Sequence, residues 1–451
     1  MKRTLIKNVT IVNEGKQFKG SVSIAGETIS DVFTADTSPS APFYDDVIDG
    51  TGCLLLPGVI DDHVHFREPG LTHKADIYSE SHAAVAGGVT AIMDMPNTNP
   101  PTVTPDALHR KLDLLNERCL VNHSCYFGAT NDNHTLFDRI ERERVCGIKL
   151  FMGSSTGNML VDRMTALEHI FRNANLPIAA HCENQTIIRR NTERIQRAYP
   201  EGAEIPIQKH AYIRSVEACY DSTKLAIRMA LDARARLHVL HLSTEKELHL
   251  FDSLSPEERS RITAEVCVAH LIFSSHDYDR LGARIKCNPS IKHPRHRAAL
   301  RKAVNNGLID VIATDHAPHL PDEKRGGALK AASGMPMIQY ALPSMLRLTD
   351  EHCFPLTTLV EKMCHAPARL FNIDRRGYIR PGYYADITLV RRGTPWRVTA
   401  DNVLSKCGWS PLEGKRFEWQ VEKTIVNGHI VYDSGQIDHD YRGMELRFHH
   451  P

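Results

Sequence analysis

The chain has 451 residues, with 55 lysines and arginines against 54 aspartates and glutamates. This balance provides no basic surface for nucleic acid or lipid, so we expect a small molecule as the partner. No apolar run reaches the roughly 18 residues of a membrane span, and the N-terminus lacks a signal-peptide pattern, which predicts a soluble, cytoplasmic protein.

Both ends of the chain are predicted to form β-structure. Residues 1–55 contain short apolar runs at 4–12, 20–24 and 28–32 separated by turns. Residues 371–451 show the same pattern between 385 and 435, where Asn427-Gly428 indicates a hairpin turn. We therefore expect the two ends to meet in one small β-sandwich domain.

Residues 56–370 alternate short apolar strands with longer helical segments. The strands are expected at residues 59–65, 89–95, 122–128, 146–151, 177–182, 237–242, 261–267 and 309–314. Eight such units are what a (β/α)8 barrel requires, so the predicted fold is an α/β barrel with the β-sandwich beside it. The longest irregular segments are expected at 188–213 and 318–334, and loops of that length usually carry function.

The segment PGVIDDHVHFREPG, residues 57–70, places His63, His65 and Arg67 at alternate positions where the first barrel strand ends. Alternate side chains of a strand share a face, so two imidazoles can bind one metal ion. The guanidinium can then bind a carboxylate beside that metal. The alternative is a chance pair of solvent-exposed loop histidines, because the chain has 25 histidines.

Four further barrel strands end in residues of similar chemistry, and in a barrel these ends form the functional face. Taken singly, His181 or His241 fits a hydrogen-bonded core residue, and Lys149 fits a lysine that reaches solvent. Asp315 alone fits a helix N-cap. Their joint occurrence favours one site, made by Lys149, His181, His241, Asp315 and His319 together with the first strand.

The charges of these residues limit how a metal pair could bind. Two divalent cations roughly 3.5–4 Å apart need a bridging anion, and Asp315 is the one obvious carboxylate among the residues named. An ammonium on Lys149 would be repelled, whereas a carbamate formed from Lys149 and carbon dioxide offers one oxygen to each metal. Glu183, two residues after His181, either supports that ligand or is exposed.

Six segments in chain order resemble the motifs of the cyclic amidohydrolases of the amidohydrolase superfamily, most closely those of the dihydroorotases. They are HVHFREPG, MPNTNPPT, GIKLFMG, AHCEN, VLHLS and ATDHAPH, and the likeness covers about residues 50–370. The resemblance implies a zinc enzyme for the reversible cyclisation of N-carbamoyl-L-aspartate to L-dihydroorotate in pyrimidine biosynthesis. It also implies a homodimer or homotetramer.

The resemblance assigns a role to each candidate residue. His63, His65 and Asp315 would bind one Zn²⁺, His181 and His241 would bind the other, and carboxylated Lys149 and a hydroxide would bridge them. Asp315 would also pass the proton of the hydroxide to the leaving ring nitrogen. The substrate-binding residues would be Arg67, Asn97 and His319 at the carboxylate, and Asn288, Ser333 and Gly334 at the pyrimidine ring.

Three alternatives to a dihydroorotase remain open. Allantoinases resemble the chain but carry asparagine at the position of Arg67, and their second motif lacks the MPNT form. Hydantoinases and dihydropyrimidinases lack the arginine because their substrates have no carboxylate to hold, so Arg67 with Asn97 favours dihydroorotate. A non-catalytic homologue would typically have lost metal ligands, and here all six candidates are present. Residues 153–157 are expected to form either a lid over the site or an ordinary turn.

Overall fold

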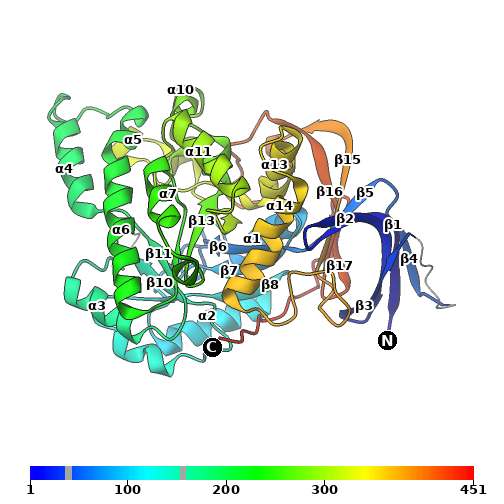
Figure 1. The fold of residues 1–451 in the computed structure, drawn as a ribbon. Helices are drawn as coiled ribbons and strands as arrows, with labels where there is room; N and C mark the ends of the chain where they lie inside the picture. Colours follow the sequence, from blue (N-terminus) through cyan, green and yellow to red (C-terminus); the bar gives the residue numbers. More distant parts are fainter. Residues whose placement is uncertain (36–42, 153–158, 451) are drawn as a thin grey trace.

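The computed structural model describes residues 1–35, 43–152 and 159–450 and places a parallel α/β barrel beside a β-sheet built from both chain ends (Figure 1). β5 joins the two ends, because it lies parallel to β1 and antiparallel to β15. The expected β-domain from both termini is therefore confirmed, whereas its limits at 55/56 and 370/371 stay a prediction. The sheet runs in the order β18 (Gln436–Ile437), β17 (His429–Asp433), β16 (Arg416–Val426), β15 (Ile387–Arg397), β5 (Cys53–Pro57), β1 (Arg3–Asn13), β2 (Lys16–Ala25) and β3 (Thr28–Thr34), with β4 (Asp46–Asp49) paired to β1.

The barrel strands lie at all eight expected positions, and they pair in parallel. The third strand is divided at Tyr126, whose N–H donates to Asp94 O. The last strand returns to the first through a bridge between Val64 and His316. The strands are β6 (Val59–Val64), β7 (Val89–Asp94), β8 (Asn122–Cys125) with β9 (Phe127–Gly128), β10 (Ile148–Phe151), β11 (Ile178–His181), β12 (Leu237–Val239), β13 (Ile262–Cys267) and β14 (Val311–Ala313).

Helices cover the outside of the barrel, and local signals begin several of them. The Thr104 hydroxyl accepts from Ala107 N at 3.2 Å ahead of Pro105, the first residue of α2. Among the described residues, no helix combines the length and apolar character needed to cross a lipid bilayer. The helices are α1 (Ile77–Ala86), α2 (Pro105–Arg118), α3 (Met164–Asn173), α4 (Gln185–Gln196), α5 (His210–Ile213), α6 (Val216–Ala233), α7 (Glu245–Asp252), α8 (Pro256–Arg259), α9 (Val268–Ile272), α10 (Tyr278–Leu281), α11 (Pro294–Asn305), α12 (Gly327–Lys330), α13 (Ile338–Asp350), α14 (Leu356–Val360) and α15 (Ala366–Phe371), with short turns of helix at η3 (Ser275–Asp277) and η5 (Pro321–Lys324).

The segment 188–213 was expected to be irregular, and this prediction is wrong. It contains most of α4 and all of α5, and Asn184 caps α4 by accepting from the N–H groups of Thr186 and Ile187. Its polar composition leaves only a narrow apolar stripe, which packs in a small cluster that includes Ile188 and Ala328. Ala328 belongs to α12, so the two long segments pack against each other.

The C-terminal tail packs at the end of the barrel where the strands begin. Leu446 and Phe448 pack with Phe371 of α15 inside the barrel, and His123 of β8 exchanges backbone hydrogen bonds with Met444 and Leu446. The C-terminus accordingly lies beside α2 in Figure 1. The candidate residues lie at the opposite end, where the strands finish.

A buried polar network joins the barrel to the β-sheet. Arg376 Nη1 lies 2.5 Å from Asp386 Oδ2 and donates to Asn427 Oδ1 at 2.7 Å. Asn122 of β8 donates to the same carboxylate at 3.1 Å. Arg376 and Asp386 are both 3% exposed at the side chain, so their charges are paired away from water.

Candidate metal centre

All twelve residues predicted from the sequence line one cavity, of about 340 Å³, at the C-terminal ends of the barrel strands. The chain reaches this cavity from β6, β10 and β11 and from the segments that follow β7, β12, β13 and β14. The twelve are His63, His65, Arg67, Asn97, Lys149, His181, His241, Asn288, Asp315, His319, Ser333 and Gly334. Residues 153–157, the expected lid or turn, lie outside the described part of the chain.

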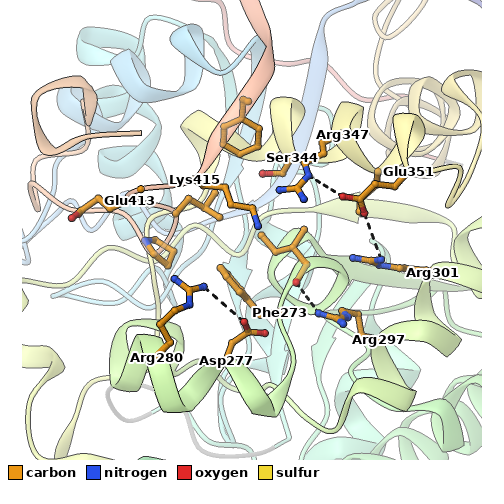
Figure 2. Close-up of a pocket in the computed structure, with 16 residues that line it drawn as sticks. Phe273, Asp277, Arg280, Arg297, Arg301, Ser344, Arg347, Glu351, Glu413 and Lys415 are labelled. Carbon is orange, nitrogen blue, oxygen red and sulfur yellow. Dashed lines mark hydrogen bonds and ion pairs between the residues drawn. The ribbon is translucent and has the colours of Figure 1, made fainter. Parts of the chain in front are cut away.

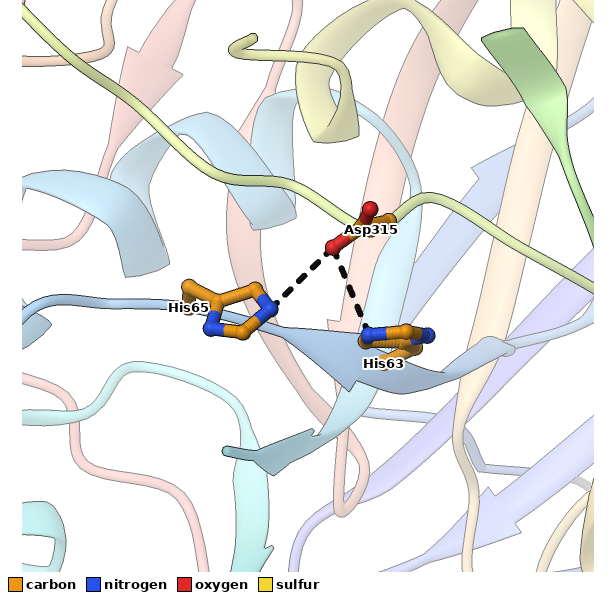
Figure 3. A group of neighbouring side chains, drawn as sticks. All are labelled: His63, His65 and Asp315. Atoms are coloured by element: carbon orange, nitrogen blue, oxygen red, sulfur yellow. Dashed lines mark ion pairs between the residues drawn. The ribbon is translucent and has the colours of Figure 1, made fainter. Parts of the chain in front are cut away.

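His63, His65 and Asp315 form a compact group (Figure 3). The Oδ1 atom of Asp315 lies 3.3 Å from His63 Nε2 and 3.1 Å from His65 Nε2. Two ligand atoms of a tetrahedral zinc, each about 2.0–2.1 Å from the metal, lie about 3.3 Å apart. Both histidines are buried, so the alternative of solvent-exposed loop histidines is wrong.

A second group consists of His181 and His241. Nδ1 of His181 lies 3.0 Å from Nε2 of His241, again close to the spacing of two ligands on one metal. The ring of His241 is also 5.4 Å, centre to centre, from that of His63. The two groups therefore adjoin, as a binuclear site requires.

Three of these histidines are oriented by a partner at their second ring nitrogen, the one that does not face another candidate ligand. His63 Nδ1 lies 3.1 Å from Glu265, His65 Nδ1 lies 2.8 Å from Asn97 Oδ1, and His181 Nε2 lies 2.9 Å from Glu183. Glu183 is fully buried, which selects support of His181 over the exposed alternative. Such partners fix the tautomer and leave the other nitrogen free for a metal.

Lys149 is buried between the two groups, with 1% exposure, so it does not reach solvent. Its Nζ atom lies 4.6 Å from the centre of the Phe151 ring. Burial lowers the pKa of Lys149 to about 8. About a tenth of the side chain is then a neutral amine at pH 7, which is the form that can react with carbon dioxide.

The pKa shifts of four of the candidate ligands suit metal binding, which requires neutral imidazoles and ionised carboxylates. Burial lowers the pKa of His65 to about 3 and also lowers the pKa values of His181 and His241. Burial opposes the ionisation of Asp315, but His63 and His65 outweigh it and hold its pKa well below the usual range. His63 differs, because Glu265 and Asp315 overcome burial and raise its pKa. The nitrogen and oxygen donors present fit a pair of divalent cations such as Zn²⁺.

The opposite wall of the cavity is cationic. Arg67 is buried; its Nε donates to Pro318 O at 3.0 Å, and its Nη2 lies 3.0 Å from His319 Nε2. Lys74 Nζ lies 3.1 Å from His319 Nδ1, so the Nδ1 atom of the neutral ring can accept a hydrogen bond from Lys74. The Nε2–H group of the same ring can then donate to Ser333 O. Arg67, His241 and Asp315 all have positive φ values between 42° and 69°. Non-glycine residues in this conformation are uncommon and tend to cluster at functional sites.

Sequence reasoning missed several residues that support the site. Glu265 is a buried carboxylate inside the otherwise apolar strand β13, and that contrast was the available signal. Lys324 lies in the segment 318–334, where nothing in the sequence distinguished it, and Trp409 gave no signal because it reaches the site from a distant segment. Lys324 Nζ donates to the carbonyls of Ala332 and Gly334 at 2.7 and 2.6 Å, and Trp409 Nε1 donates to His319 O at 2.7 Å.

Residues 54–431 match the model of the amidohydrolase family, and the chain belongs to that family. A dihydroorotase of Methanosarcina acetivorans is 30% identical over 443 residues, which cover 96% of this chain and 89% of the relative. An allantoinase of Deinococcus radiodurans is 28% identical over 455 residues, covering 98% of each chain. The solved L-hydantoinase of Arthrobacter aurescens superimposes with a TM-score of 0.91 at 25% identity, covering 97% of this chain and 98% of that one.

The chain is more narrowly a cyclic amidohydrolase, an enzyme that hydrolyses cyclic amides of the kind named by these relatives. Members of the family typically bind metal, and the group of His63, His65 and Asp315 fits an ion. Fold, family and reaction class thus agree with the expectations from the sequence.

Proposed function

We propose that this enzyme is a dihydroorotase, which closes N-carbamoyl-L-aspartate to L-dihydroorotate and reopens the ring in the reverse direction. The observation that carries the proposal is the buried guanidinium of Arg67 in the cavity that holds the candidate metal ligands. Dihydroorotate has a ring carboxylate, which an arginine binds through paired charge-assisted hydrogen bonds. Relatives named dihydroorotase at 29–33% identity support the choice.

In this proposal the centre would hold two Zn²⁺ ions. His63, His65 and Asp315 would bind one, His181 and His241 would bind the other, and carboxylated Lys149 would supply the anion between them. When bound, such a pair supplies hydroxide at neutral pH and polarises the amide carbonyl. The lowered pKa of Lys149, caused by burial, supports carboxylation because the amine must be neutral to react.

The cationic wall orients the substrate. Arg67 binds the ring carboxylate, and the Nδ2 group of Asn97 is available to join it, because His65 engages only the Oδ1 atom. Burial, Arg67 and Lys74 lower the pKa of His319, so its ring is neutral, and its one N–H would donate to the carboxylate in place of Ser333 O. When the substrate carboxylate binds here, fixed hydrogen-bond donors of the protein replace the water around it. These donors favour one orientation of the substrate ring.

The remaining contacts face the ring. The buried Oδ1 atom of Asn288 has no hydrogen-bond partner among the described residues. Burying an acceptor without a partner costs free energy, so a ring N–H is a suitable donor for it. Ser333 and Gly334 line the same cavity.

Asp315 moves the proton. Its carboxylate is held ionised by His63 and His65 despite burial, so it can accept the proton of the attacking oxygen. In ring opening it passes that proton to the ring nitrogen as the amide bond breaks, and in ring closure it returns the proton to the departing water. The balance also includes one solvent proton: ring opening consumes water and releases a proton as the new carboxylate forms, and ring closure takes up a proton and releases water.

Substrate preference tests the proposal against its rival, a hydantoinase or allantoinase activity, which the L-hydantoinase and allantoinase relatives favour. The purified enzyme is offered dihydroorotate, 5-substituted hydantoin, allantoin and dihydrouracil in separate assays. We expect dihydroorotate to be turned over fastest. A preference for any uncharged ring would overturn the assignment.

Replacing the proposed carboxylate ligand tests the same point from the side of the protein. Arg67→Ala should lower dihydroorotate turnover by orders of magnitude and leave the zinc content at about two per chain. Arg197→Ala, an exposed arginine next to α4, is the control. Turnover within a few-fold of the wild type in Arg67→Ala would contradict the role.

The homo-oligomeric assembly and the cytoplasmic location stay predictions.

A further inference from the structure

A second cavity, of about 490 Å³, lies between α10, α11, α13 and the segment 411–417 that leads into β16. It shares no lining residue with the candidate metal centre. Figure 2 shows Lys415 reaching into its middle, with arginines around it. Its cationic side chains come from four parts of the chain: Arg280 of α10, Arg297 and Arg301 of α11, Arg347 of α13, and Lys415.

The carboxylates of this cavity do not balance its cations. Glu413 is already paired with Arg284, which does not line the cavity. Glu351 accepts from Arg347 Nε at 2.9 Å, and Asp277 lies 3.9 Å from the nearest nitrogen of Arg280. Two carboxylates therefore face five cationic groups.

Several of the cations lie close enough to repel one another, although Arg297 and Arg301 donate to the carbonyls of Ile272 and Leu271, and Arg301 lies 3.9 Å from Glu351. No hydrogen bond or ion pair engages Lys415 Nζ within the described chain, and burial together with Arg347 and Arg280 lowers its pKa. Burial likewise lowers the pKa of Arg301, and the charge of Arg297 adds to this effect. Like charges held together in a concave site repel one another, and a bound anion would relieve that repulsion.

We propose that this cavity binds a small phosphate-bearing anion. Its guanidinium and ammonium groups approach from several directions, which matches the tetrahedral oxygens of a phosphate better than the two coplanar oxygens of a carboxylate. Phe273, Leu348 and Phe417 form an apolar part of the lining that suits the organic portion of a phosphate ester. The volume lies in the range of cavities that hold metabolite-sized ligands.

Calorimetric titration of the full-length, zinc-loaded protein at constant ionic strength tests the proposal. The probes are inorganic phosphate, phenyl phosphate and the dicarboxylate succinate. We expect phenyl phosphate to bind more tightly than phosphate, and both to bind more tightly than succinate. Absence of phosphate and phenyl phosphate binding, or equal binding of succinate, would overturn the proposal.

Variants locate the bound probe. Arg280→Gln combined with Lys415→Gln removes two cations whose side chains donate no hydrogen bond that holds the fold in the described chain, so zinc content and melting temperature should stay unchanged. Phenyl phosphate should bind at least tenfold more weakly to this double variant, and as in the wild type to Arg190→Gln, an exposed arginine of α4. Arg67→Ala should leave this binding intact. Binding that survives the double variant and is lost in Arg67→Ala would place the anion in the metal cavity and refute the second site.

Discussion

Oε1 of Glu265 lies 3.1 Å from Nδ1 of His63, and both side chains are buried. The carboxylate accepts a hydrogen bond from the Nδ1–H group of His63, which leaves the Nε2 atom directed at Asp315. The same glutamate accepts the backbone N–H of His241 at 2.8 Å. Glu265 therefore orients one residue of each candidate metal group, although it does not line the cavity itself.

Replacing Glu265 should weaken metal binding. In Glu265→Gln the amide keeps the shape but no longer stabilises the N–H of His63 by charge, and loss of such support typically lowers metal affinity by about 10–100-fold. Zinc affinity measured by competition with a chelator checks this. Glu247→Gln is the matched control, because Glu247 is equally buried and bonds to Thr223 and Thr244 instead of a histidine. Equal zinc affinity in both variants would show that Glu265 is structural only.

Replacing Lys149 should remove the proposed bridge. Lys149→Met cannot form a carbamate, so the zinc content should fall from about two per chain to one or fewer, because neighbouring cations need a bridging anion. Wild-type protein loaded with ¹³C-bicarbonate should show a carbamate signal by NMR that the variant lacks. Lys362→Met, at another buried lysine, should retain both the signal and the zinc. A wild-type protein with two zinc ions and no carbamate signal would refute the bridge.

Lys324 should affect substrate binding more than chemistry. Its ammonium donates to the carbonyls of Ala332 and Gly334, on either side of Ser333. In Lys324→Met these carbonyls lose a buried donor, at a cost of about 1–3 kcal/mol, so we expect KM to rise about tenfold while zinc content is unchanged. Steady-state kinetics with Lys330→Met as an exposed control on α12 checks this. A fall in kcat at constant KM would contradict a positioning role.

The junction of barrel and sheet should be sensitive to loss of one charge. Arg376→Met leaves the buried Asp386 without its cation, and breaking a buried ion pair in this way costs about 3–5 kcal/mol. The free energy of unfolding by denaturant measures the loss. Arg375→Met alters an ion pair that is half exposed, for which we expect less than about 1 kcal/mol. Similar losses in the two variants would mean that the network is not a stabilising junction.

The sequence predicted the barrel well because its signal is local. Each strand is a short apolar run followed by a helix, and parallel strands in this arrangement bring their C-terminal ends together. His63, His181, His241 and Asp315 follow that pattern, so the sequence alone predicts their convergence.

Features made by distant segments could not be predicted in the same way. The C-terminal tail has no apolar periodicity, and its place beneath the barrel depends on backbone bonds to His123. Trp409 reaches His319 across 90 residues of sequence through one hydrogen bond. The helix α4 was missed because its buried stripe is narrow, with Ile188 as its one fully buried residue.

The pairing of β5 with β15 has a consequence for biosynthesis. The segment 53–57 leaves the ribosome more than 300 residues before its partner strand at 387–397, so the edge of β5 that faces away from β1 remains unpaired during most of translation. Unpaired apolar strands of this kind are prone to aggregate, and contacts so far apart in sequence form slowly. The nascent chain thus has a long interval in which a chaperone that shields extended apolar segments would raise the yield of folded enzyme.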